Sequence, residues 1–127
     1  MAAVIILLKP DCMERRLWGT ALEFLQTETD FKIHDSRLYH ACVPTILKLV
    51  KHYAEHQGKP FYDGLMEFMV SGPILAISGW SGNIPRMREN IARFRVKHAE
   101  SGPRNLIHCS DSPESGEREA DIWFPSA

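Results

Sequence analysis

The residues best suited to chemistry lie near the end of the chain, around His108. The stretch 106–110 has the pattern of a short strand. Successive side chains of a strand point to opposite faces, so we expect Leu106, His108 and Ser110 on one side and Cys109 on the other. This pattern predicts an imidazole presented at the end of a strand, with a hydroxyl close to it.

A helix is expected to follow this strand. Ser112 and Pro113 form a typical helix start, with a hydroxyl at the N-cap and proline at the first helical position. That helix would run back beside the imidazole with Glu114, Glu117 and Glu119. A carboxylate within reach of a histidine fixes its tautomer and ring angle, as a nucleophilic or basic histidine requires. A purely structural histidine is the alternative that the stretch alone leaves open.

Three further segments carry chemical side chains, and each adjoins an expected strand or helix. They comprise Lys9-Pro10-Asp11, the run 52–62 with His52, Tyr53, Lys59 and Phe61, and the turn 69–74 around Ser71-Gly72-Pro73. Together with the stretch 105–112, Glu119 and Trp123-Phe124, they resemble the active-site signature of the nucleoside diphosphate kinase family. The resemblance covers residues 4–124, nearly the whole chain.

The resemblance implies a role for each matching side chain. His108 would be the nucleophile in a reversible ping-pong transfer of the γ-phosphate from a nucleoside triphosphate to a nucleoside diphosphate. Glu119 would orient the imidazole and Ser110 would steady that pair. The remaining matches would bind the nucleotide: Lys9, Tyr53, Arg88 and Arg95 at the phosphates, Asn105 at the sugar or phosphate, Phe61 and Leu65 around the base. Mg²⁺ would arrive with the nucleotide phosphates and would not need a protein cage.

One alternative concerns the phosphate-binding arginines. Arg95 lies ten residues before Asn105, where the family has such an arginine, and this placement needs no gap. Arg88 would be the second phosphate-binding arginine, and Arg86 is the main alternative.

The segment 89–94 between Arg88 and Arg95 is about ten residues shorter than the corresponding segment of the family and lacks its phosphate-contacting threonine. A nucleotide-binding or scaffolding relative with little turnover is therefore the alternative function.

Composition bounds the class of protein. With 127 residues and 44% hydrophobic content, residues 1–127 are expected to form a single domain with a substantial core. The net charge of −1 gives no reason to expect a nucleic acid or a membrane as partner. Three cysteines in no regular pattern indicate reduced thiols and a cytoplasmic location. The apolar run 2–8 is too short to cross a bilayer.

The order of elements predicts the fold. A continuous apolar strand at 3–8 precedes a helix at 16–27, a strand from Phe31 to Leu38, a helical pair, a strand at 74–78, a basic helix and the final strand and helix. In the helix after Val43-Pro44, the apolar face is expected at Ile46, Leu47, Val50 and Tyr53. The order agrees with an α/β (α+β) fold, a ferredoxin-like split βαβ sandwich with a four-stranded antiparallel sheet covered by helices.

The short segment 89–94 also affects the expected assembly. In the resembling family the longer segment, with a Pro-rich surface loop, and a C-terminal extension commonly join dimers into larger oligomers. This chain ends at Ala127, soon after Phe124. We therefore expect a homo-oligomer in which a dimer is favoured over a hexamer.

The spacing of His52, Glu55 and His56 suggests a different chemistry, that of a zinc site. Their H-x-x-E-H spacing is that of a zinc-peptidase helix, in which two histidines one turn apart bind the metal. Such a site needs a third protein ligand. A solvated helix end with two histidines is the simpler interpretation of this segment.

Overall fold

The protein, described by a computed structural model for residues 1–126, is built on one antiparallel sheet. Its four strands lie in the order β2-β3-β1-β4. They span Ala2–Leu8 (β1), Lys32–Tyr39 (β2), Ile74–Ser81 (β3) and Ile107–Cys109 (β4). The central β1 is buried from Val4 to Leu8, as expected of a continuous apolar run that is covered on both faces.

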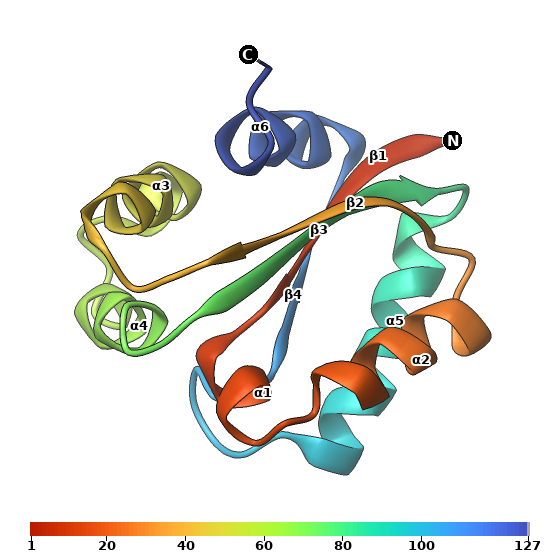
Figure 1. Ribbon diagram of the computed structural model, residues 1–127, viewed down its shortest axis with the longest axis horizontal. Coiled ribbons are helices and arrows are strands. Elements are labelled where there is room, and N and C mark those ends of the chain that lie inside the picture. The colour runs from red at the N-terminus through yellow and green to blue at the C-terminus, as the bar shows by residue number, and fades with distance from the viewer. Residues whose placement is uncertain (127) are drawn as a thin grey trace.

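Helices cover both faces of the sheet (Figure 1). One face carries α1 (Pro10–Glu14), α2 (Trp18–Glu28) and α5 (Ile84–His98), which bury a core with β1 residues such as Val4 and Ile6. The other face carries α3 (Val43–His52), α4 (Tyr62–Met69) and α6 (Pro113–Trp123), which bury a core with Ile5 and Leu7. The predicted ferredoxin-like α+β sandwich is confirmed.

Helix α6 lies unusually close to the sheet at one residue. A side-chain Cβ placed on Gly116 would lie 1.9 Å from the carbonyl oxygen of Ala3, so only glycine fits at this contact. Ser112 caps the helix by accepting a hydrogen bond from the Ser115 backbone N–H at 3.1 Å, as the Ser-Pro start predicted. The cap and the glycine contact together fix where α6 lies over β1.

Two local expectations were wrong. Strand β4 begins at Ile107, and Leu106 has a φ of +72°, which turns its side chain into the core that holds Cys109. Helix α3 buries Leu49 and His52 against the sheet and α6, while Leu47 is 59% exposed. Ile46 and Val50 are exposed as well, and of the expected face Tyr53 alone, directly after the helix, is buried. The buried face of α3 is therefore rotated from the most apolar one.

Candidate active site

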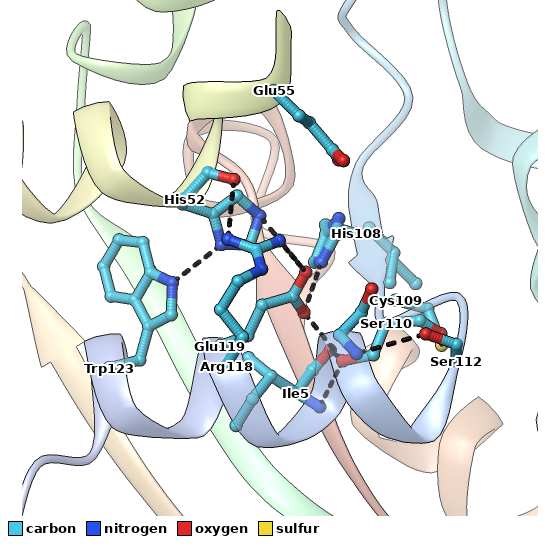
Figure 2. A network of polar contacts seen from close by, with 12 residues as sticks. Ile5, His52, Glu55, His108, Cys109, Ser110, Ser112, Arg118, Glu119 and Trp123 are labelled. Carbon is cyan, nitrogen blue, oxygen red and sulfur yellow. Dashed lines mark hydrogen bonds and ion pairs between the residues drawn. The ribbon is translucent and has the colours of Figure 1, made fainter.

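A carboxylate, an imidazole and a hydroxyl meet between β4 and α6 (Figure 2). His108 Nε2 donates to Glu119 Oε1 at 3.0 Å, and Ser110 Oγ donates to the same oxygen at 2.7 Å. Ser110 and Glu119 are buried, whereas the His108 side chain remains 19% exposed. Because Nε2 is held by the carboxylate, Nδ1 is the ring nitrogen that stays available as a nucleophile.

The strand and helix that meet here explain this arrangement. His108 pairs with Leu7 of β1, so the two side chains share the face covered by α3 and α6. Ser110 Oγ also accepts the backbone N–H of Ile5 at 2.8 Å, which anchors the end of β4. Glu119 is buried on α6, while Glu114 and Glu117 are exposed. Of the three glutamates considered from the sequence, only Glu119 reaches the imidazole.

Lys9 lies at the end of β1 and is 5% exposed. Its Nζ donates to Asn105 Oδ1 at 2.6 Å and to the Pro103 carbonyl at 3.4 Å. Burial and the nearby Arg95 charge lower the pKa of Lys9 to about 8, although Asp11 opposes the shift. A nearby anion stabilises the charged form of an ammonium whose pKa is lowered, so Lys9 is suited to contact a phosphate.

Four of the predicted nucleotide-binding residues line one cavity of about 650 Å³. Its lining comes from Phe61, Gly64 and Leu65 in one segment and Gly102, Pro103 and Asn105 in another, together with Lys9. Phe61 is 52% exposed, which is a large apolar surface to leave to water without a ligand. The slot has the apolar walls and the placed cation that a nucleotide requires.

The two arginines predicted to bind phosphate lie on one helix. The segment 89–94 forms two turns of α5, and Arg88 and Arg95 are seven residues apart, so they share a face. Burial and the Arg88 charge lower the pKa of Arg95, whose Nε has no hydrogen-bond partner within residues 1–126. Arg86 instead lines a groove beside the residues Thr27, Glu28, Thr29 and Asp30. The geometry therefore favours Arg88 over Arg86.

Tyr53 lies directly after α3 and is 6% exposed. Burial and the Glu119 charge raise the pKa of its phenol above the ordinary value. Its hydroxyl has no hydrogen-bond partner in the part of the chain that the structure describes. A buried unsatisfied hydroxyl and the unpartnered Arg95 Nε are groups that a bound phosphate could satisfy.

His52 was not predicted to belong to this site. Its ring packs edge-on against His108, with 4.5 Å between ring centres, and its Nε2 lies 3.9 Å from Glu119 Oε2. Trp123 Nε1 donates to His52 Nδ1 at 3.0 Å. Burial and neighbouring cationic groups, His108 first, hold the pKa of His52 well below its usual range. Trp123 follows Glu119 by one helical turn, but no signal in the sequence links either residue to His52.

The zinc-peptidase interpretation of residues 52–56 requires one continuous helix, which the structure does not have. Helix α3 ends at His52, and Ala54–His56 is a separate 3₁₀ turn. His52 is buried against Trp123, whereas His56 Nε2 lies 3.7 Å from Glu55 Oε1 at the surface. A solvated helix end is also wrong for His52, which is 2% exposed.

Comparison with known protein sequences points to the same family as the geometry of the site. The family model for nucleoside diphosphate kinase matches residues 3–127. A nucleoside diphosphate kinase of Mycobacterium sp. (strain MCS) is 35% identical over 141 aligned positions, covering 95% of each chain.

Solved structures show the same likeness. Nucleoside diphosphate kinase from Aquifex aeolicus superposes with a TM-score of 0.84 at 32% identity, covering 97% of this chain and 94% of the other. The enzyme from Halobacterium salinarum, solved in complex with CDP, has a TM-score of 0.79 at 28% identity, covering 98% and 88%. The motif resemblance is therefore confirmed, and this chain belongs to the nucleoside diphosphate kinase family of phosphotransferases.

Proposed function

We propose that the protein transfers the γ-phosphate of a nucleoside triphosphate to a nucleoside diphosphate through a phosphohistidine at His108. The observation that carries the assignment of the nucleophile is the 3.0 Å hydrogen bond between His108 Nε2 and Glu119 Oε1. It leaves Nδ1 with its lone pair, and Ser110 on the same carboxylate oxygen fixes the direction in which the ring points.

The transfer proceeds in two balanced halves. His108 Nδ1 forms a bond to the γ-phosphorus while the bond from phosphorus to the β–γ bridging oxygen breaks, and the electron pair leaves with the diphosphate. Nε2 keeps its proton, and Glu119 stabilises the positive charge that develops on the ring. A terminal oxygen of a second diphosphate then attacks the phosphohistidine and restores His108. The phosphoramidate is reactive enough for both directions to proceed.

The cationic and phenolic groups would stabilise the phosphoryl group during its transfer. Lys9, Arg88 and Arg95 would neutralise its oxygens and the Tyr53 hydroxyl would donate to one of them. Electrostatic stabilisation and positioning are the main contributions that a protein makes to phosphoryl transfer. Asn105 would contact the sugar or a phosphate and hold the Lys9 ammonium through their 2.6 Å hydrogen bond.

The apolar slot would take the base. Phe61 would stack on one face of the base, and Leu65 would line the same pocket. Stacking on an aromatic ring accepts any base, since every base has a π-face. The slot therefore supports the use of several nucleoside di- and triphosphates.

Mg²⁺ is proposed as the cofactor, held by the phosphates of the nucleotide. Within residues 1–126, one group of three side chains has the spacing of metal ligands, and its members are His52, His108 and Glu119. That group holds nitrogen donors, whereas Mg²⁺ requires oxygens. Carried by the nucleotide, Mg²⁺ would neutralise phosphate charge during transfer, alongside Lys9 and the arginines.

Three features of the structure bear on the location and the assembly of the protein. No helix in residues 1–126 is long and apolar enough to span a membrane. The three cysteines are free, which supports the proposed cytoplasmic location. We also propose a homodimer, because β2 is an eight-residue edge strand whose side chains are exposed on both faces of the sheet.

The decisive experiment is intact-mass analysis after mixing the protein with Mg-ATP, with His108→Ala beside it. We expect one acid-labile phosphoryl group, removed by GDP and absent from the variant. Nucleotide binding with no adduct would instead establish the alternative, a nucleotide-binding or scaffolding relative.

A further inference from the structure

The hydrogen bond between Trp123 and His52 determines the tautomer of a buried imidazole. Trp123 is fully buried and His52 is 2% exposed, and 3.0 Å separates Trp123 Nε1 from His52 Nδ1. An indole N–H can only donate, so His52 Nδ1 must accept with its lone pair. The proton of the neutral imidazole therefore lies on Nε2.

That Nε2–H group faces the catalytic carboxylate (Figure 2). Glu119 Oε1 already accepts from His108 and Ser110, and His52 Nε2 lies 3.9 Å from Oε2. Arg118 approaches the same Oε2 at 3.6 Å from the solvent side, where its own side chain is 43% exposed. The dipole of the His52 N–H group thus stabilises the negative charge on the second carboxylate oxygen from the buried side.

The same tautomer decides whether the cluster can bind a transition metal. The ligand atoms of His52, His108 and Glu119 lie within 4.8 Å of one another, and two histidines with one glutamate form a common zinc-binding set. A histidine binds metal through an unprotonated nitrogen. His52 could free Nε2 only by moving its proton to Nδ1, where it would meet the Trp123 N–H, and two donors would then face each other.

We propose that Trp123 is a positioning residue that locks His52 in the Nε2–H tautomer, keeping its N–H directed at Glu119 and closing the His52–His108–Glu119 cluster to zinc. The consequence for phosphoryl transfer rests on the proposed roles of His108 and Glu119. The tautomer and the exclusion of zinc do not depend on catalysis. They can be measured on the protein without nucleotide.

The first test reads the tautomer directly. Long-range ¹H–¹⁵N spectra of the imidazole rings in the wild-type protein, assigned with His52→Gln, are expected to show a protonated Nε2 and an unprotonated Nδ1 for His52. An Nδ1-protonated ring would overturn the proposal even in a fully active enzyme. Absence of phosphohistidine with the expected tautomer would overturn the proposed function instead.

The second test uses Trp123→Phe, which keeps an aromatic ring but removes the N–H, with the exposed Trp18→Phe as the matched control. We expect Trp123→Phe to bind Zn²⁺ by calorimetry at least about tenfold more tightly than wild type. Adding His52→Leu should abolish this gain, and Trp18→Phe should behave as wild type. Unchanged zinc affinity in folded Trp123→Phe would overturn the exclusion of zinc by the indole.

Phosphorylation kinetics supply a readout that a loss of packing alone would not give. In Trp123→Phe we expect His108 phosphorylation to slow about tenfold with nucleotide affinity unchanged, because only the support of Glu119 is weakened. An equal loss of affinity would indicate general disorder of the site and would contradict the positioning role. If this variant fails to fold, the tautomer measured in the wild-type protein still decides the proposal.

Discussion

One oxygen of Glu119 accepts hydrogen bonds from both His108 and Ser110. A substitution that removes the negative charge of Glu119 therefore tests how much this charge contributes to phosphorylation of His108. Glu119→Gln keeps the size of the side chain but removes the charge that we propose to stabilise the developing positive charge on the His108 ring. We expect His108 phosphorylation by Mg-ATP to slow about 100-fold, with ADP affinity nearly unchanged. Rapid-quench kinetics would measure this rate.

Glu117→Gln is the matched control for that change. Glu117 lies on the same helix two residues earlier, and it is exposed. It should retain the wild-type phosphorylation rate. A Glu119→Gln variant as fast as Glu117→Gln would contradict the orienting role of Glu119.

We expect Lys9 to make nucleotide binding depend on pH. Its pKa is lowered to about 8 by burial and the Arg95 charge, so the free protein loses this ammonium as the pH rises through that value. Bound phosphate favours the protonated form, so affinity for ADP should be full below about pH 7 and fall towards about pH 9. Calorimetric titrations across this range would measure the change, and Lys9→Met should bind weakly with a flatter profile.

Most residues proposed for the phosphate and base sites could be expected from the sequence, because they belong to short motifs that resemble those of the family. Periodicity placed His108 and Ser110 on one strand with three glutamates on the helix that follows, and the family resemblance selected Glu119 among them. His52 differs, since its partner Trp123 is 71 positions away. Only the packing of α3 against α6 makes that contact, and no local pattern encodes it.

Among the elements, α6 depends most on close contact with the sheet. A Cβ on Gly116 would lie 1.9 Å from the Ala3 carbonyl oxygen, so Gly116→Ala must move the helix that carries Glu119 away from β1. We expect the free energy of unfolding to fall by about 2–3 kcal/mol in urea denaturation, a typical cost of overpacking. His108 phosphorylation should slow as well, because Glu119 moves with α6.

Gly19→Ala is the corresponding control on α2. A Cβ at Gly19 meets no atom within 4 Å, so alanine should be neutral or should stabilise the helix by up to about 1 kcal/mol. If both substitutions shifted the urea midpoint equally, helix propensity and not the α6–β1 contact would be the cause.

The elements themselves were predictable in type and order, but the buried face of α3 was not. Residues 3–8 form a strand because six consecutive apolar residues favour burial on both sides. In α3, the apolar Ile46, Leu47 and Val50 predicted a core face, yet they are exposed while His52 is buried. His52 can lie inside because Trp123 supplies its hydrogen bond, a tertiary contact that hydropathy does not measure.

At the scale of the whole molecule, the sheet ends in a long unpaired edge. Within residues 1–126, strand β2 pairs with β3 alone, and its residues Ile33 and Leu38 are 39% and 50% exposed. Trp80, the residue opposite Lys32 on β3, is 40% exposed. Charged side chains and a bulge between Ile33 and Asp35 protect part of this edge. The exposed apolar side chains of Ile33, Leu38 and Trp80 remain, and they support a contact between two copies of the chain.

Leu38→Lys tests whether that edge joins the proposed dimer. A lysine there would replace one of the exposed apolar side chains of β2 with a charge, and in a symmetric dimer the change acts on both subunits. We expect the dimer dissociation constant from sedimentation equilibrium to rise at least about tenfold, while the urea midpoint of the separated subunit stays near wild type because Leu38 is half exposed. Val96→Lys, at a position 89% exposed on α5, should leave the dimer intact. A wild-type monomer, or a dimer unaffected by Leu38→Lys, would show that β2 is not the interface.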